Sequence, residues 1–217
     1  MHLTRADHQK KVVRTLSAAQ VLNGVGVTGT VAAGSLLVAS ISNSEALAGL
    51  AQTTSVMGAA AMALPLAKLT QRGGRRLALS VGYGVGVVGA VLAILGGTHK
   101  ILFLMLAGAF LVGAASASGY QARFAAIDLA TPEHRSKNLS IVVWGSTVGA
   151  VTGPNLMQPS GNFAEFIGLP RLVGPYFIAA SSLMLAIIVI QIFLKPDPYL
   201  TANVAADGIT QKKHVPT

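Results

Sequence analysis

The chain contains six long stretches that hold no Asp, Glu, Lys or Arg. They cover residues 15–44, 46–67, 77–98, 101–122, 138–164 and 172–194. A helix rises 1.5 Å per residue, so about 20 apolar residues cross the roughly 30 Å hydrocarbon core of a bilayer. Every stretch reaches that length. The sequence therefore predicts an all-helical, polytopic membrane protein with six transmembrane helices, whose first partner is the lipid bilayer.

Charged or turn-rich segments separate these stretches and set the predicted helix limits. We expect helices at about 15–41, 46–69, 76–97, 100–128, 135–156 and 172–194. Together they form one transmembrane domain over residues 1–198, and residues 199–217 are predicted to be a disordered polar tail in the cytoplasm. The first stretch is longer than the apolar core of a signal peptide, so we expect it to be retained.

The 16 Lys and Arg residues are distributed unevenly between the two sides of this predicted domain. If the amino terminus is cytoplasmic, 14 of the 16 fall in cytoplasmic segments, and only Lys100 and Arg171 fall outside. Short basic loops resist translocation, so this distribution predicts that both termini face the cytoplasm. The net charge of +9 would also suit nucleic acid. We exclude that partner because the basic residues are divided among four loops without interleaved aromatic residues.

The sequence offers no constellation for enzymatic chemistry or for metal binding. It has no cysteine, no clustered acid/base pair and no nucleophile elbow. Two G-x-G-x-x-G patterns, which begin at Gly24 and Gly84, lie inside uninterrupted apolar runs and not after a strand, so they do not indicate nucleotide sites. The histidines fall in predicted termini or loops, where solvated side chains are commoner than ligands: His2, His8, His99, His134 and His214. We therefore predict no enzyme, no cofactor and no metal.

Glycines repeat at every fourth position in two of the predicted helices. Gly145, Gly149 and Gly153 do so in the fifth helix, and Gly82 and Gly86 do so in the third. Such stripes of small residues let helix backbones approach closely in a membrane. For the third helix, simple packing without a mechanistic role explains the stripe equally well.

Polar residues inside the predicted spans are candidates for a solute-binding cavity, because polar groups are costly in hydrocarbon. The candidates are Asn23, Gln52, Tyr120, Gln121, Arg123 and Trp144. Arg123 fits equally a side chain that extends to the cytoplasmic lipid headgroups. Trp144 fits an interfacial anchor or a packed core residue at least as well as a ligand contact.

The segment between the second and third predicted helices carries the most specific motif. Residues 67–76 read A-K-L-T-Q-R-G-G-R-R. This resembles the pattern that members of the major facilitator superfamily carry at the same place, a small residue followed by x-L-x-D-R-x-G-R-R. The matching residues are Leu69, Arg72, Gly74, Arg75 and Arg76. Gln71 stands where the family has an Asp that is thought to join the charge network between the two halves of the transporter.

An acid near the cytoplasmic end of the fourth helix gives this motif a partner. Asp128 lies close to the predicted membrane boundary, and Arg135 follows at the start of the fifth helix, which is similar to the family's quasi-repeated layout. We predict an ion pair between Arg75 and Asp128 that couples helices two, three and four. The alternative is independent solvated charges, because exposed pairs contribute only about 0 to 1 kcal/mol.

The fifth helix provides a second resemblance. The run from Gly149 to Pro154, G-A-V-T-G-P, is similar to the G-x-x-x-G-P signature of the superfamily's antiporters, and Gly145 precedes it. Pro154 removes a backbone donor and bends the helix, so this end of the helix acts either as a hinge or as a seal. The antiporter resemblance implies efflux, with H⁺ as a candidate coupling ion. Ala109 stands where these antiporters often carry an Arg.

A complete member of the superfamily has two six-helix halves around a central cavity, and each half is made of two inverted three-helix repeats. The resemblance covers about residues 10–200 and fits the amino-terminal half; the exit from the sixth helix, K-P-D-P at 195–198, is similar to that of bacterial drug-efflux-like members. It implies alternating-access transport of a small organic solute across the bacterial inner (plasma) membrane. A second six-helix half, from a homodimer or a separate chain, would complete the cavity. A truncated or nontransporting protein that associates through its glycine-rich faces is the alternative.

Overall fold

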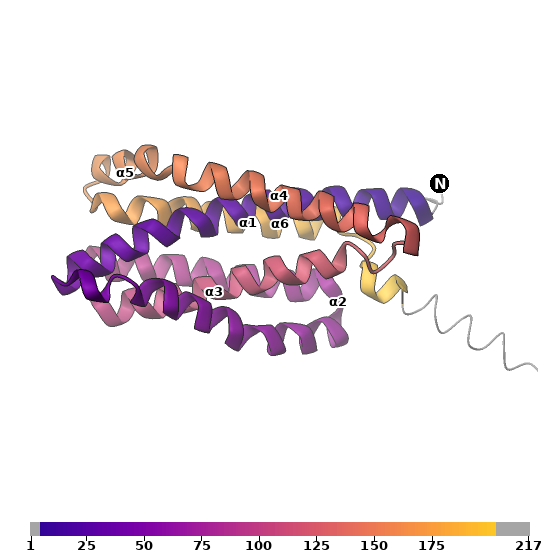
Figure 1. Cartoon of the computed structure of the whole chain (residues 1–217), viewed down its shortest axis with the longest axis horizontal. Helices are drawn as coiled ribbons and strands as arrows, with labels where there is room; N and C mark the ends of the chain where they lie inside the picture. Colours follow the sequence, from indigo (N-terminus) through magenta and orange to yellow (C-terminus); the bar gives the residue numbers. More distant parts are fainter. Residues whose placement is uncertain (1–4, 203–217) are drawn as a thin grey trace, which may run out of the picture.

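The computed structural model describes residues 5–202, and within that range it consists of helices and their connections. The elements are α1 (Arg5–Ser42), η1 (Glu45–Leu47), α2 (Leu50–Thr98), α3 (Leu102–Ala125), η2 (Pro132–His134), α4 (Arg135–Asn155), α5 (Met157–Phe166), η3 (Arg171–Val173) and α6 (Gly174–Phe193). The long helices run side by side along one axis (Figure 1). The predicted all-helical fold class is confirmed. Most of the predicted tail, with His214, lies outside the described residues, as does His2.

α2 consists of two rods joined at a sharp bend. Its 49 residues would extend about 73 Å as one straight helix, more than twice the thickness of a hydrocarbon core. At Gly74 the backbone has φ 84° and ψ 174°, a conformation that glycine adopts readily because it has no Cβ. The chain therefore turns back on itself between a first part of α2, residues 50–73, and a second part, residues 75–98.

Within residues 5–202, four helical segments are long and apolar enough to cross a membrane: Asp7–Ser42, Glu45–Thr98, Leu102–Ala125 and Arg171–Ala202. The second segment contains both parts of α2 and, at 54 residues, is long enough for two crossings. α4 has 21 residues, which is long enough, but its many Asn, Ser, Thr and Gly residues leave it outside this set of strongly apolar segments. In order along the chain, the six uncharged stretches correspond to α1, the two parts of α2, α3, α4 and α6.

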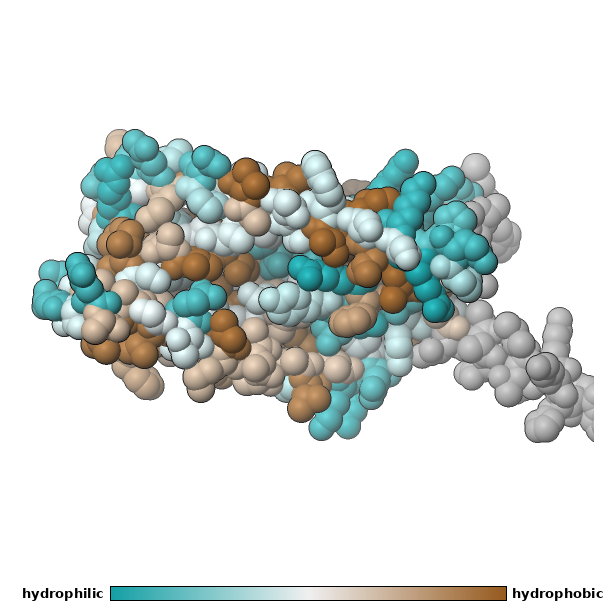
Figure 2. Space-filling view, viewed as in Figure 1, coloured by the Kyte–Doolittle hydropathy of each residue, from teal (hydrophilic) through white to brown (hydrophobic). Residues whose placement is uncertain are grey.

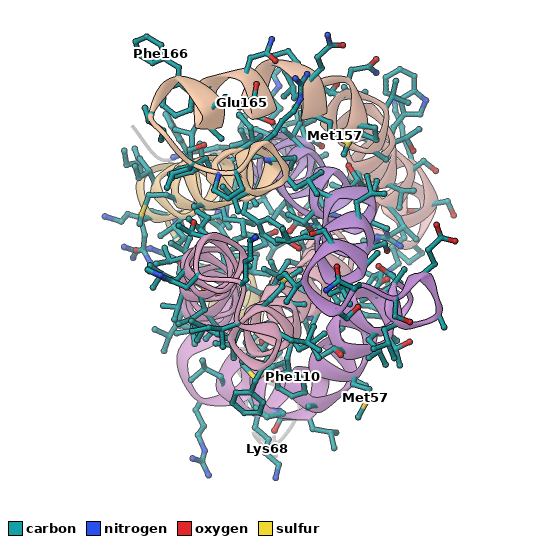
Figure 3. The ribbon with its side chains drawn as sticks, turned by 90° about the vertical axis from the view of Figure 1, so that its left-hand side faces the viewer. Met57, Lys68, Phe110, Met157, Glu165 and Phe166 are labelled. Carbon is teal, nitrogen blue, oxygen red and sulfur yellow. The ribbon has the colours of Figure 1, made fainter. Side chains whose placement is uncertain are left out.

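The helices pack into two neighbouring groups. α1 packs against α4 and α6, whereas α2 packs mainly against α3. Seen along the bundle, Met57, Lys68 and Phe166 point away from the helices (Figure 3). Large apolar side chains such as Leu64 and Phe103 are also exposed on the outside. Exposed apolar surface of this extent suits contact with lipid, because lipid tails impose no penalty on it.

The glycine stripe of α4 lies against α1. A Cβ added to Gly145 would lie 2.8 Å from the carbonyl oxygen of Ser17, and one added to Gly149 would lie 2.7 Å from Cα of Gly24. Further along, a Cβ on Gly153 would lie 3.0 Å from the backbone nitrogen of Gly29. The first G-x-G-x-x-G pattern therefore serves helix packing, since two of its glycines face α4.

The stripe on the second part of α2 lies against α3. A Cβ added to Gly82 would meet the Ser118 hydroxyl, and one added to Gly86 would lie 2.8 Å from Cβ of Ala115. Both stripes are thus filled by neighbours within this chain.

The start of α1 and the end of α6 lie at the same end of the bundle (Figure 1). Since each long helix runs the length of the bundle, the bend at Gly74 and the α3–α4 connection lie at that end too. The described basic residues near it are Lys10, Lys11, Arg14, Lys68, Arg72, Arg75, Arg76, Arg123, Arg135, Lys137 and Lys195. Lys100 and Arg171 belong to the connections at the opposite end. We call the end that holds the start of α1, the end of α6 and the bend at Gly74 the basic end.

Candidate functional site

Arg75 is held at the basic end by two side chains from α3 and the segment after it. Its Nε lies 2.8 Å from Oδ2 of Asp128, and its Nη2 lies 3.2 Å from Oδ1, so the ion pair is bidentate. Its Nη1 donates to Oε1 of Gln121 at 2.8 Å. Arg75 is only 9% exposed, which strengthens charge-assisted bonds of this kind. The ion pair predicted from the sequence is present, and it joins the bend of α2 to the end of α3.

A second carboxylate reaches the same bend from the segment after α6. Oδ2 of Asp197 accepts the backbone N–H of Arg76 at 2.7 Å. A Cβ added to Gly74 would lie 2.5 Å from that oxygen, so a larger residue would push the carboxylate out of this position. Arg76 is in the first turn of the second part of α2, where backbone N–H groups lack helical partners and negative charge is favoured. Asp197 therefore caps this helix from 121 residues away.

The start of α1 holds the same exit segment from its other side. His8 is buried in α1, and its Nε2 lies 3.2 Å from the carbonyl oxygen of Pro196. Lys11 donates from Nζ to the carbonyl oxygen of Lys195 at 3.3 Å. The prediction that His8 is a solvated terminal residue is wrong, because α1 begins at Arg5 and extends beyond its uncharged stretch. Within the described ranges, no group of three or more His, Asp or Glu is placed to hold a metal.

These contacts make one polar assembly at the basic end. We call it the clasp, and define it as Arg75, Arg76, Gln121, Asp128 and Asp197. It ties together the bend of α2, the end of α3 and the exit from α6. The other residues predicted around this bend stay outside it: Gln71, Arg72 and Arg135 are exposed, and Leu69 is half-buried.

A polar cavity of about 300 Å³ opens between α1, α3 and α4. That volume is enough for a small organic molecule. Its polar lining includes Gln20, Asn23, Thr28, Tyr120, Arg123, Ser146 and Thr147. A second hollow of about 440 Å³ continues along the first part of α2 and shares Val27, Ser116 and Tyr120 with the cavity. On this side of the bundle, pale and teal residues lie among the brown apolar ones (Figure 2).

The cavity contains buried polar groups without partners. Gln20 is 1% exposed and Asn23 is 7% exposed. Gln20 donates from Nε2 to the carbonyl oxygen of Gly119 at 3.0 Å, yet its Oε1 and the Oδ1 of Asn23 accept no hydrogen bond. The guanidinium carbon of Arg123 lies 5.1 Å from the centre of the Tyr120 ring, and its buried Nε has no partner. A buried polar group without a hydrogen bond costs free energy unless water, a ligand or another chain supplies the missing partner.

The structure distributes the six predicted cavity residues over three places. Asn23, Tyr120 and Arg123 line the polar cavity. Gln52, Gln121 and again Tyr120 line the second hollow, and Gln121 also binds Arg75. Trp144 lies outside both and is 70% exposed on α4.

Sequence reasoning missed Gln20, Thr28, Ser146 and Thr147 in the cavity and Asp197 in the clasp. Gln20 comes three residues before Asn23, so both lie on one face of a helix, and that spacing was a usable signal. Asp197 had no local signal beyond its place in the K-P-D-P exit.

Pro154 is exposed near the end of α4, and α4 stops one residue later, just before α5 begins at Met157. The proline therefore stands beside a break between two helices. A hinge and a seal both fit that position.

Comparison with known proteins shows which family this chain resembles. A model of the Major Facilitator Superfamily matches residues 16–214. The uncharacterized MFS-type transporter YdeG of Bacillus subtilis is 37% identical over 194 residues, which is 89% of this chain and 45% of the relative. YddS, an uncharacterized MFS-type transporter of the same organism, is 35% identical over 202 residues, which is 92% of this chain and 46% of that relative.

A third relative is the riboflavin transporter RfnT of Brucella anthropi, which is 28% identical over 155 residues, or 71% of this chain and 39% of its own length. No solved structure matches the chain significantly. The chain spans about half the length, 45% and 46%, of the first two relatives. Since the family model covers nearly the whole chain and the fold is a bundle of membrane-crossing helices, the chain belongs to the Major Facilitator Superfamily, a family of membrane transporters and not of enzymes.

Proposed function

We propose that this chain forms one half of a secondary transporter that moves a small organic solute by alternating access. The observation that carries the proposal is the polar cavity between α1, α3 and α4, whose buried amide oxygens have no partner. Groups of this kind avoid lipid, so the cavity must face water, a solute or another protein surface. A solute path between two halves meets that need.

A second six-helix half faces the cavity in this proposal, either from a second copy of the chain or from a separate polypeptide. The lengths of YdeG and YddS support it, because the matched part accounts for 45% and 46% of each relative. The remainder of each is long enough for a second half of similar size.

The clasp is the proposed gate at the basic end. It joins three segments through short charged contacts, so it favours one arrangement of the helices over others. In the other state of the cycle, the bend of α2 and the end of α3 move relative to each other and the contacts loosen. The asymmetry between the basic end and the opposite end supports an orientation with both termini in the cytoplasm, in the bacterial inner membrane.

Efflux coupled to H⁺ is the finer part of the proposal. Its support is the antiporter-like run from Gly149 to Pro154 in α4. The described lining of the cavity includes no Asp or Glu, so in this proposal the proton-binding group lies elsewhere in the assembled transporter.

The alternative function, association of a nontransporting protein through glycine-rich faces, is less well supported. The faces in question are already covered, because Gly149 meets Gly24 of α1 and Gly86 meets Ala115 of α3. They are therefore not free to bind another chain.

Transport in proteoliposomes tests the proposal. The chain alone and the chain joined to the carboxy-terminal half of YdeG are reconstituted separately, and a pool of labelled organic solutes is offered with and without an imposed pH gradient. We expect the joined protein to move at least one solute faster than empty vesicles, and to slow when an ionophore removes the gradient. Folded protein that moves none of the pool in either form contradicts the proposal. Transport that ignores the gradient removes only the proton coupling.

A further inference from the structure

The positive charge in the polar cavity is not balanced by any described acid. Arg123 is the charged residue of the lining, and its Nε is buried without a hydrogen bond. Asp128, five positions further along the chain, is bound by Arg75. Asp197 is bound by the backbone of Arg76. A guanidinium group that is partly withdrawn from water gains from an anion with two oxygens, because its N–H groups form a planar fork.

Two acceptor oxygens deeper in α1 would be satisfied by a hydrogen-bond donor and not by an anion. Oε1 of Gln20 and Oδ1 of Asn23 are both buried and both lack a donor. Gly119 leaves the space that this arrangement needs, since a Cβ there would lie 2.5 Å from Nδ2 of Asn23. Because Gly119 has no side chain, the amide of Asn23 can lie against α3 at the wall of the cavity. A ligand O–H or N–H would satisfy these oxygens, whereas a purely acceptor-bearing ligand would not.

The adjoining hollow adds room for an apolar part. It runs from Tyr120 along Val31, Ala59 and Ala63. The Tyr120 ring borders both spaces, and a flat group can stack on it beside the guanidinium of Arg123.

From this arrangement we propose that the cavity binds a small organic oxyanion, of the carboxylate class, that also carries O–H or N–H donors and an apolar or aromatic portion. The anionic end lies at Arg123, the donors meet Gln20 and Asn23, and the apolar portion lies toward the second hollow. This inference rests on the proposed transport function and names the class of its substrate. A lipid phosphate shares the oxyanion chemistry, so the test separates the two sources.

Binding is measured with three probes of nearly equal size: 4-hydroxybenzoate, which is anionic, 4-hydroxybenzamide, which is neutral, and tyramine, which is cationic. Each is titrated onto the full chain in phosphatidylcholine nanodiscs while the unfolding midpoint is recorded. We expect 4-hydroxybenzoate to raise the midpoint more than the other two. Arg123→Gln is expected to weaken its apparent affinity about tenfold, as for loss of a charge-assisted bond, and to leave the response to 4-hydroxybenzamide unchanged.

Lys137→Gln is the matched control, because it removes a positive charge from an exposed position of α4 at the same end. Equal responses to the three probes, including no response to any, overturn the inference, as does an Arg123→Gln chain that keeps the preference for the anion. Repeating the titration in phosphatidylglycerol nanodiscs gives the lipid arm. If phosphatidylglycerol is enough to abolish the Arg123-dependent rise of the unfolding midpoint with 4-hydroxybenzoate, the lipid headgroup is the anion that Arg123 binds. The solute proposal then fails.

This readout needs no transport, so the two proposals can fail separately. Anion binding without solute movement in proteoliposomes contradicts the transport function alone. Solute movement without anion preference contradicts the substrate class alone.

Discussion

Two arginines near the basic end have opposite surroundings. Arg75 is bound by Asp128 and Gln121 and is almost fully covered. Arg123 lies in an open cavity, with a tyrosine ring beside it and no carboxylate partner among the described residues. Gln121 and Arg123 are only two positions apart on α3, and at about 100° per residue they point to different sides of the helix. Gln121 therefore supports the ion pair of Arg75, whereas Arg123 borders the polar cavity in which we propose that a solute binds.

Breaking the ion pair between Arg75 and Asp128 should have the largest effect on the free energy of unfolding. Asp128→Ala is expected to lower the free energy of unfolding by about 3 kcal/mol, because it leaves the Arg75 guanidinium covered and without its counterion. Denaturant unfolding of the purified chain in detergent measures the loss, and Asp128→Asn is the matched variant that keeps the shape of the side chain. The double variant with Arg75→Ala should cost less than the sum of the two single changes. A loss below about 0.5 kcal/mol would instead favour independent solvated charges.

Removal of the cap on the second part of α2 should have an intermediate effect. Asp197→Ala is expected to cost about 1 kcal/mol, because the N–H of Arg76 loses its acceptor and the helix start loses a negative charge. Asp197→Asn keeps an acceptor oxygen and should retain part of the stability. The same unfolding assay compares the two variants. If both lose equally, the charge alone matters and the hydrogen bond does not.

Removal of the unpaired charge should have the smallest effect on stability. Arg123→Gln is expected to change the free energy of unfolding by less than about 0.5 kcal/mol, because no ion pair is broken and the guanidinium is only partly withdrawn from water. Arg75→Gln, measured beside it, should be clearly destabilised. Similar losses in the two variants would mean that Arg123 supports the fold, and the contrast between the arginines would disappear.

The clasp shows how far sequence reasoning reaches. Arg75 and Asp128 could be paired because each stands at a helix end on the predicted cytoplasmic side, and charges at that boundary seek partners. Asp197 could not be assigned, because its contact with Arg76 joins residues 121 positions apart and depends on where α6 ends relative to the bend. Gln121 was expected to face a solute, whereas it also binds Arg75, since its helical phase places it between both sites.

The cavity residues also divide into those that the sequence could identify and those that it could not. Asn23 and Arg123 were identifiable because a polar group inside an apolar stretch has to be satisfied. Trp144 met the same criterion, yet it projects from the exposed side of α4, and no rule applied to one helix alone reveals which side its neighbours cover.

The sequence by itself determined that the chain forms membrane-crossing helices, because the length and the apolar character of a helix are local properties. The tertiary structure decided which polar side chains are satisfied and which remain open. That outcome depends on the rotation and spacing of packed helices, which are set by contacts such as Gly149 against Gly24 between distant parts of the chain.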